Sequence, residues 1–419
     1  MGTRRRFGLL LACLPIACAP PAPRSATPAT VAPADGANAT TAYDERSGTG
    51  YVAWIHSDGH SADVYLASAR EGAAWSAPVR VNHVPGDAAA HEQAPPQVAL
   101  TGDGGVLVLW HTARAIPGRR FLASDLRFAR SDDGGASFSP AIFVNDDAGG
   151  EPSSHTFHDI AVAADGTILV SWIDGRQRDA ARAAAAPADA GVGSAHDHGP
   201  PDLPGSEVRV ARSRDGGASF DAGVVVDRTT CPCCRTSLAI GPDGRVHVAF
   251  RRIAPDGARD VHVATSLDGG ESFAAPVRVH ADDWRIDGCP HAGASIGVSG
   301  DGRLHVAWYT GAGERPGIYY ASSVDGRRFD RPVPLLADRW MPPAQVQLAA
   351  DVRGAWLAWD DRRTPERRIG VARAEQGRVG AAAQIPVAGS APAIATARPG
   401  ALLTWTDAGL VRAARIDPR

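Results

Sequence analysis

Residues 131–138 read Ser-Asp-Asp-Gly-Gly-Ala-Ser-Phe, and near-copies follow at 213–220 (Ser-Arg-Asp-Gly-Gly-Ala-Ser-Phe) and 266–273 (Ser-Leu-Asp-Gly-Gly-Glu-Ser-Phe). A shortened copy occupies 323–329, and a degenerate one 69–75. The Asp can accept backbone N–H bonds across a hairpin, glycine permits the turn, and the aromatic residue can pack into a sheet. We therefore expect structural hairpins. The spacing lacks the alternating oxygen ligands of a calcium loop, which argues against calcium binding.

Each hairpin segment belongs to a longer repeat. An apolar strand leads through a tight turn into a second strand that ends in an aromatic residue, and in most repeats a third strand follows. Asp-Gly pairs in four of the tight turns are a strong hairpin signal between apolar runs. Repeats of this length are typical of β-propeller blades. The second strands are expected at 51–54, 107–110, 169–172, 247–250, 305–308, 356–359 and 402–405.

The hairpin segments resemble the Asp-boxes (S-x-D-x-G-x-x-F/W) of the sialidase-like, or BNR-repeat, β-propeller superfamily. The resemblance covers roughly residues 40–419 and implies an all-β fold, with one propeller domain at 39–419 built from four-stranded antiparallel blades. Seven blades are favoured, and six, the number in sialidases proper, is the alternative. The last repeat, 391–416, offers only three strands, so a segment between Ser25 and Asn38 is expected to add the fourth.

Composition agrees with a fold of many short strands. The 419 residues include 46 glycines and 32 prolines, and all 43 basic residues are arginine. Turn formers in this number argue against a helical bundle. The formal net charge of -3 gives no broad basic field, so no nucleic-acid partner is expected. We expect a monomer.

The first residues are typical of an export signal. Arg4, Arg5 and Arg6 precede an apolar stretch at 7–17 that is too short to span a bilayer. Residues 15–18, Pro-Ile-Ala-Cys, resemble a bacterial lipobox. We predict a signal peptide at 1–18 with lipidation of Cys18; Cys13 and an ordinary signal peptide are the alternatives.

A Pro/Ala-rich tether is expected at 19–38. The predicted location is extracytoplasmic, in a bacterial periplasm or on a cell surface, with membrane contact only through a lipid anchor.

Potential metal ligands recur at one position of the repeat. In an antiparallel meander the starts of the first strands and the ends of the second strands share one face, the usual ligand face of the family. Insertion 176–206, which carries His196 and His198, is expected there too. The candidate ligands are His91, His155, His158, Cys231, Cys233, Cys234, Cys289, His291 and Met341.

Three interpretations of this set remain open. Thiolate, imidazole and thioether ligands suit copper, with zinc second. Alternatively, four cysteines in an oxidising compartment form disulfides, for example between Cys289 and one of Cys231, Cys233 or Cys234, on a surface protein-interaction platform. Reactive thiol chemistry is the third. Partners at the channel mouth are accordingly a metal ion, a small ligand or a glycan.

The family resemblance also raises the alternative of a sialidase-type exo-glycosidase, and the sequence leaves open whether the chain is an enzyme. Sialidases use three arginines, a Tyr/Glu nucleophile pair and an Asp acid/base. The Arg-Ile-Pro motif of sialidases is missing from this sequence. No Glu is evident beside a Tyr that is expected to face the channel. The weak catalytic candidates are Arg235, Arg252, Asp174, Asp360 and Tyr309.

Overall fold

The computed structural model describes residues 23–32, 35–117, 122–185 and 205–417. The predicted signal peptide, Cys13, Cys18, the first part of the tether, and His196 and His198 lie outside the described residues. Within those residues, no helix is long and apolar enough to cross a membrane.

The described strands form antiparallel sheets, which confirms the all-β prediction. The first sheet contains β3 (Gly36–Asp44), β4 (Thr49–Ser57), β5 (Ala62–Arg70) and β6 (Val79–Arg80). The second contains β7 (Gln97–Leu100), β8 (Val106–His111), β9 (Leu126–Ser131) and β10 (Ile142–Phe143).

Two further meanders follow. The first comprises β11 (His155–Val162), β12 (Ile168–Asp174), β13 (Ser206–Ser213) and β14 (Val224–Thr230). The second comprises β15 (Ser237–Ile240), β16 (Val246–Ile253), β17 (Arg259–Ser266) and β18 (Val277–Arg278). One residue pair, Thr230 with Arg252, joins β14 to β16, so the two meanders form a continuous eight-stranded sheet.

Three sheets complete the chain. One contains β19 (Ser295–Val298), β20 (Leu304–Thr310), β21 (Gly317–Ser323) and β22 (Val333–Ala337). The next contains β23 (Val346–Ala350), β24 (Gly354–Asp361) and β25 (Arg368–Glu375), and both β26 (Arg378–Val379) and β27 (Ala383–Ala388) pair with β25. The last contains β28 (Ser390–Ala397), β29 (Gly400–Asp407) and β30 (Leu410–Asp417).

The sequence patterns act locally as expected. The second strands coincide with β4, β8, β12, β16, β20, β24 and β29. In the turns before four of them, Gly104, Gly166, Gly244 and Gly302 adopt φ of 98°, 87°, 78° and 78°, a left-handed conformation that favours glycine.

The Asp-box hairpins are closed by their own side chains. Ser266 Oγ accepts the Gly270 N–H at 2.8 Å and donates to Asp268 Oδ1 at 2.6 Å. The same carboxylate oxygen accepts the Ser272 N–H at 2.9 Å. Hydrogen bonds from Ser266 and Ser272 therefore lower the pKa of Asp268. These bonds give the repeated Ser and Asp a structural role.

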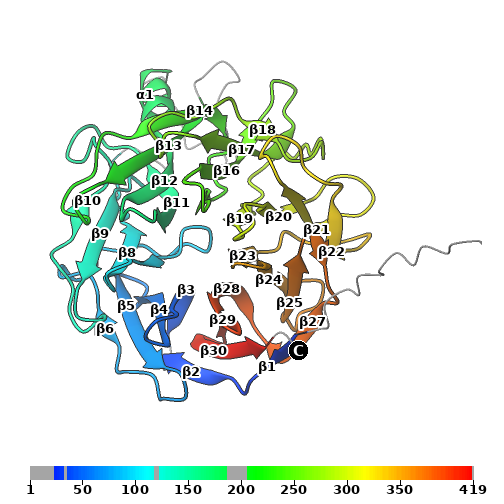
Figure 1. The fold of residues 1–419 in the computed structure, drawn as a ribbon. Coiled ribbons are helices and arrows are strands. Elements are labelled where there is room, and N and C mark those ends of the chain that lie inside the picture. Colours follow the sequence, from blue (N-terminus) through cyan, green and yellow to red (C-terminus); the bar gives the residue numbers. More distant parts are fainter. Residues whose placement is uncertain (1–22, 33–34, 118–121, 186–204, 418–419) are drawn as a thin grey trace, which may run out of the picture.

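The sheets are arranged around a common centre (Figure 1). The first strand of each meander, here called an inner strand, packs against the inner strand of the next, and β28 packs against β3. Apolar clusters lie between successive sheets; one combines Tyr51 and Leu66 of the first sheet with Val108 and Trp110 of the second. The inner strands are β3, β7, β11, β15, β19, β23 and β28.

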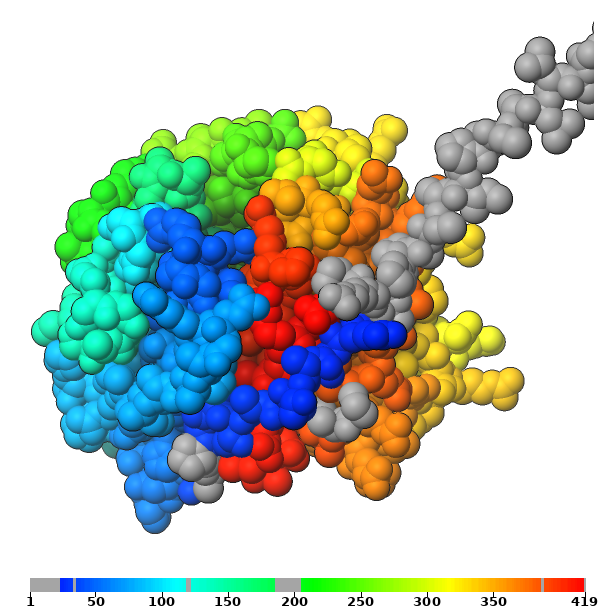
Figure 2. Space-filling model, turned by 60° about the horizontal axis from the view of Figure 1, so that its bottom comes forward, coloured from blue at the N-terminus to red at the C-terminus, as the bar shows by residue number. Residues whose placement is uncertain are grey.

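The N-terminal segment joins the last sheet. β2 (Ala29–Ala32) and β1 (Arg24–Ser25) both pair antiparallel with β30. Figure 2 shows this dark blue segment running beside the red C-terminal strands. Val31 and Ala32 are buried in a cluster with Trp54 and Val411, so they contact both the first and the last sheet. The strand falls within the segment that the sequence analysis proposed for this place.

Insertion 176–206 begins differently from the loop expected from its composition. Residues Arg176–Ala185 form helix α1, whose alanines have the highest helix propensity. Asp174 Oδ1 accepts the Arg176 N–H at 3.0 Å and thereby satisfies a donor of the first turn.

Candidate metal centre

A cavity of 460 Å³ opens among the loops that precede the inner strands β7, β11, β15 and β19. Residues from β8 and α1 complete its wall. Besides apolar side chains, its lining includes three histidines, two cysteines and two arginines: His91, His111, His291, Cys233, Cys289, Arg178 and Arg182. Donor atoms for a soft metal therefore converge from segments that are far apart in the sequence.

Four thiols lie at one end of this cavity. The sulfurs of Cys231, Cys233 and Cys234 all lie within 4.8 Å of one another, and the Sγ atoms of Cys231 and Cys233 are 3.5 Å apart. Cys233, Cys289 and one ring nitrogen of His291 form a second group within the same distance. The four cysteines are free thiols in this structure.

Two buried arginines hold the segments that carry the thiols. Arg251 donates to Ala292 O at 2.9 Å and to Tyr309 O at 2.8 Å, and its own carbonyl accepts the Cys231 N–H at 2.7 Å. Arg259 Nη1 donates to Gly288 O at 2.6 Å and lies 3.9 Å from Cys231 Sγ. Arg259 through its guanidinium, and Arg251 through its guanidinium and its carbonyl, thus link the loop before β15 to the loop before β19, and both place positive charge near the sulfurs.

The environment distributes protons unevenly among the thiols. Burial alone would raise the pKa of Cys234, but hydrogen bonds from Cys231 and Cys233 and the Arg251 guanidinium lower it well below its usual range. A hydrogen bond from Cys233 lowers the pKa of Cys289. The pKa of Cys233 itself is raised by its hydrogen bonds to the other thiols. The hydrogen bond with Cys233 would lower the pKa of Cys231, but the hydrogen bond with Cys234 and burial outweigh it and raise that pKa as well. Cys234 and Cys289 are therefore the thiols that most readily form thiolates, the form that binds metals.

His91 and His291 border the thiols from neighbouring loops. Their ring centroids are 5.9 Å apart, and His91 also meets the Phe157 ring edge-on at 5.2 Å. Burial and the neighbouring His291 lower the pKa of His91, which favours the neutral, metal-binding imidazole. Phe157 and His291 have φ of 57° and 47°, a conformation that non-glycine residues adopt at a cost and that often marks functional sites.

His158 lies away from the thiols. Its ring is fully buried, and its centroid is 5.8 Å from that of His111. Burial lowers the pKa of His158 to about 4. Of the two rings, only His111 lines the cavity.

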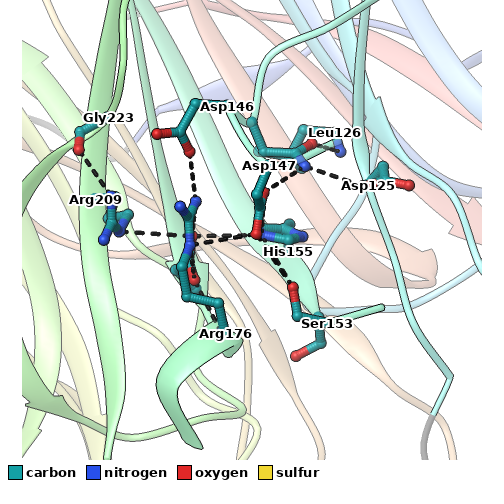
Figure 3. A network of polar contacts seen from close by, with 12 residues as sticks. Asp125, Leu126, Asp146, Asp147, Ser153, His155, Arg176, Arg209 and Gly223 are labelled. Carbon is teal, nitrogen blue, oxygen red and sulfur yellow. Dashed lines mark hydrogen bonds and ion pairs between the residues drawn. The ribbon is translucent and has the colours of Figure 1, made fainter. Parts of the chain in front are cut away.

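His155 belongs to a separate network of charged groups (Figure 3). Its Nε2 lies 3.0 Å from Asp147 Oδ1 and 3.4 Å from Asp174 Oδ2, and its Nδ1 lies 2.8 Å from Ser124 O. Asp174 in turn accepts from Arg176 and from Trp172 Nε1. These contacts engage both ring nitrogens of His155 and bind Asp174 to Arg176.

Met341 and Tyr309 lie in the apolar core. Tyr309 OH donates to the Met341 carbonyl at 2.7 Å, and both side chains pack with Trp284. Burial raises the pKa of Tyr309 to about 12. Met341 thus belongs to this apolar cluster and does not line the cavity.

Arg235 fills the centre of the ring. Its side chain is 5% exposed, and Nη2 donates to Val346 O at 3.1 Å. With its amide oriented to accept, Gln347 Oε1 lies 2.7 Å from the same nitrogen. Nearby, the Gln93 amide bonds to Gln345, and its Oε1 accepts the Gly293 N–H at 3.0 Å. Polar residues at or just before the starts of the inner strands β7, β15, β19 and β23 therefore bond to one another.

Asp360 and Arg252 complete the list of sequence candidates. Asp360 is fully buried, accepts from Arg362 Nε at 2.7 Å, and has its pKa raised by burial. Arg252 is 40% exposed and lies 3.2 Å from Asp227. The structure does not bring the five catalytic candidates together at the cavity.

Some residues of the cavity were missed by sequence reasoning. His111 directly follows Trp110, which ends a second strand, so the rule that placed second-strand ends on this face could have found it. Arg178 reaches the cavity from α1 and donates to Ser154 Oγ at 3.1 Å and Ser206 Oγ at 2.8 Å. No sequence signal predicts this placement, because it depends on how α1 packs against the sheet.

Comparisons with known proteins show similarity in structure only. No protein-family model and no curated protein sequence matches the chain. An ulvan lyase of polysaccharide lyase family PL25, solved bound to -[GlcA(1-4)Rha3S]-, aligns with a TM-score of 0.59 at 12% identity over 94% of this chain and 96% of its own.

A protein of unknown function from Dyadobacter fermentans has a TM-score of 0.53 at 13% identity, covering 95% of this chain and 100% of that one. A Hadza microbial sialidase has a TM-score of 0.48 at 15% identity, covering 84% and 73%. At identities this low, the similarities to the ulvan lyase and to the Dyadobacter fermentans protein show only that the folds are alike.

Proposed function

We propose that this chain is a metal-binding protein that holds a transition metal, copper in preference to zinc, at the cysteine cluster formed by the loops before β15 and β19 beside the cavity. The observation that carries the proposal is the convergence of Cys231, Cys233 and Cys234 within 4.8 Å, beside a second group of Cys233, Cys289 and His291. Three buried sulfurs that close together, next to two guanidiniums, form a soft and charge-balanced donor set.

The donor chemistry favours copper. Soft thiolate ligands select copper(I), whereas structural zinc sites have four ligands in a tetrahedron. The buried group offers three sulfurs, and Cys289 is in the other group. A three-coordinate thiolate site therefore fits the residues better than a tetrahedral one.

The proposal includes the architecture and location expected from the sequence. We take the meanders as seven blades of a sialidase-like propeller, supported by the contacts of β28 with β3 and the pairing of β2 with β30. Export, lipidation of Cys18 and an extracytoplasmic location are supported by the residues at 4–18. A metal held in that compartment serves storage, transfer or a redox task.

The other two functions receive less support. A sialidase-type hydrolase needs reachable catalytic groups, yet Arg235 and Tyr309 are buried and hydrogen-bonded. An interaction platform with disulfides needs no histidine beside the sulfurs, whereas His291 lies within reach of Cys233 and Cys289.

Metal analysis tests the proposal. The chain, reduced and freed of metal, is exposed to copper(I) or zinc, desalted and analysed for bound metal. The wild type is expected to retain copper more strongly than zinc, and the double variant Cys233→Ser/Cys234→Ser to retain neither. The matched control His280→Ala removes an exposed histidine outside the cavity and should bind as the wild type does.

Two results would overturn the proposal. One is reduced wild-type protein that stays free of metal after both exposures. The other is unchanged copper retention in the double variant. Release of sialic acid from a fluorogenic glycoside, abolished by Arg235→Ala, would instead support the hydrolase.

A further inference from the structure

The two donor groups have one atom in common, the sulfur of Cys233. Ligands of a single ion lie about 2.3 Å from it when they are sulfurs, so they are at most about 4.6 Å from one another. Each group of three comes close to this condition. Among the described residues, no single group that contains all four sulfurs meets the same 4.8 Å limit. One central ion therefore does not account for the arrangement.

The two groups also differ in their surroundings. Cys231 and Cys234 are 0% exposed and lie next to Arg251 and Arg259. Cys289 is half-buried and His291 is exposed, and both line the cavity. Cys233 lies between the two environments, because it is 5% exposed and yet reaches the cavity wall. An ion in the first group is enclosed by protein, and an ion in the second faces the cavity.

Charge determines the kind of ion. In the enclosed group, the thiolates of Cys231, Cys233 and Cys234 carry three negative charges, and Arg251 and Arg259 beside them supply two positive ones. One monovalent ion neutralises the remainder, whereas a divalent ion leaves a buried excess of positive charge. An uncompensated charge in a buried site is costly. Copper(I) is monovalent and accepts thiolate and imidazole ligands.

We infer that the centre holds two copper(I) ions bridged by the Cys233 sulfur. This rests on the proposed function and refines it. The inner ion is bound by Cys231, Cys233 and Cys234, and the outer ion by Cys233, Cys289 and His291. The thiols give up their protons on binding, and no change of oxidation state occurs. The outer ion alone is reachable from the cavity, so it exchanges with ligands in solution first.

Anaerobic titration with copper(I) against a chromophoric copper(I) chelator measures the stoichiometry. Wild-type protein is expected to bind two equivalents. Cys231→Ser and Cys289→Ser should each retain one equivalent, lost from the inner and outer site respectively. Cys233→Ser should weaken both equivalents, and His291→Ala only the one that exchanges faster. His280→Ala should still bind two.

X-ray absorption gives a second readout. A copper–copper scattering shell is expected in fully loaded wild-type protein and should vanish in Cys289→Ser loaded with one equivalent. Circular dichroism of each apo variant establishes that it is folded.

The possible failures are distinguishable. If the wild type binds one equivalent, and both Cys231→Ser and Cys289→Ser abolish it, the centre has one ion; the inference fails and the proposed function stands. If Cys233→Ser still binds two equivalents tightly, the bridge is disproved. A wild type that binds no copper defeats the proposed function itself.

Discussion

At the scale of single residues, the repeated serines and aspartates of the Asp-box hairpins stabilise the fold. Ser266 Oγ is buried and bonds to both Gly270 and Asp268. Its counterparts Ser131 and Ser213 each accept the N–H of the corresponding glycine in their own hairpin, at 2.8 Å in both cases. The candidate metal ligands lie elsewhere in the chain, so the most frequent motif in the sequence has a structural role.

Removing this hydroxyl tests its role. Ser266→Ala leaves the Gly270 N–H without its acceptor and is expected to lower the free energy of unfolding by about 1–2 kcal/mol. Ser272→Ala, at an exposed position of the same hairpin, is expected to cost less than about 0.5 kcal/mol. Urea denaturation compares the two, and equal losses would contradict the assignment.

The His155 network makes stability depend on pH. Burial alone would lower the pKa of His155, but Asp147 and Asp174 raise it above its usual value. A raised pKa means that the folded state binds the proton more tightly. This stabilisation is complete below the unfolded pKa of about 6.5 and is lost as pH rises through the folded value.

His155→Gln should therefore be more destabilising in acid than in base. We expect a loss of about 3 kcal/mol near pH 5 and a smaller loss near pH 9, because at high pH the wild-type imidazole is neutral too. Chemical denaturation at both pH values measures this, with His280→Gln as an exposed control. A loss that grows towards high pH would refute the charged state assigned to His155.

At the scale of elements, β2 joins the two ends of the chain. It pairs with β30, and Val31 packs among Trp54 of the first sheet and Val411 of the last. Antiparallel pairing supplies the last sheet with a partner that its own repeat lacks. It also covers an edge of β30 that would otherwise present unpaired backbone groups.

Val31→Asp should disrupt this junction. Val31 is 5% exposed, so the substitution buries an unpaired carboxylate and is expected to cost about 3 kcal/mol or more. The control Val84→Asp alters a valine that is 60% exposed and should change little. Thermal unfolding of both variants tests this prediction. Equal melting temperatures for Val31→Asp and Val84→Asp would show that β2 contributes nothing to stability.

At the scale of the whole molecule, inner strands from distant repeats meet at the centre. Gln93 contacts Gln345, and Gly293 donates to Gln93 Oε1. Gln345 Nε2 donates to His291 O at 2.9 Å, so the same bonds help to position one of the candidate metal ligands. Stability at the core of the ring and geometry at the site are therefore linked.

Gln93→Leu tests that link. The variant keeps the side-chain volume but leaves the Gly293 N–H and the Gln345 amide unsatisfied, which is expected to cost about 2–3 kcal/mol. It should also weaken copper binding, since His291 loses part of its support. Gln384→Leu, at an exposed position, is the control. Unchanged stability and copper affinity would argue against the coupling.

Metal binding should stabilise the entire fold. Cys233 comes from the loop before β15, and Cys289 and His291 come from the loop before β19, so an ion bound by this group would tie two meanders together. At a free copper(I) concentration a hundred times the Kd, the gain is about 2.7 kcal/mol. Differential scanning calorimetry should show a melting temperature that rises with copper(I) in wild-type protein and stays constant in Cys231→Ser/Cys233→Ser.

The sequence by itself determined the strand pattern. Apolar runs, Asp-Gly turns and Asp-boxes act over a few residues. The positions of β4, β8, β12 and the hairpin glycines therefore follow from the local sequence. The same alternation identified the face on which Cys231, Cys233, Cys234, Cys289 and His291 meet. Local signals therefore sufficed for the fold class and for the set from which the candidate ligands come.

Only the tertiary structure decided which members of that set lie together. His155, His158 and Met341 occupy similar places in their repeats, but Asp147 and Asp174 engage His155, His158 packs beside His111, and Met341 belongs to the apolar cluster around Tyr309. His111 and Arg178 reach the cavity from positions that no repeat marks. The physical reason is that ligand distances depend on how neighbouring sheets pack and on where α1 folds back. Both are long-range contacts, and no periodicity along the chain encodes them.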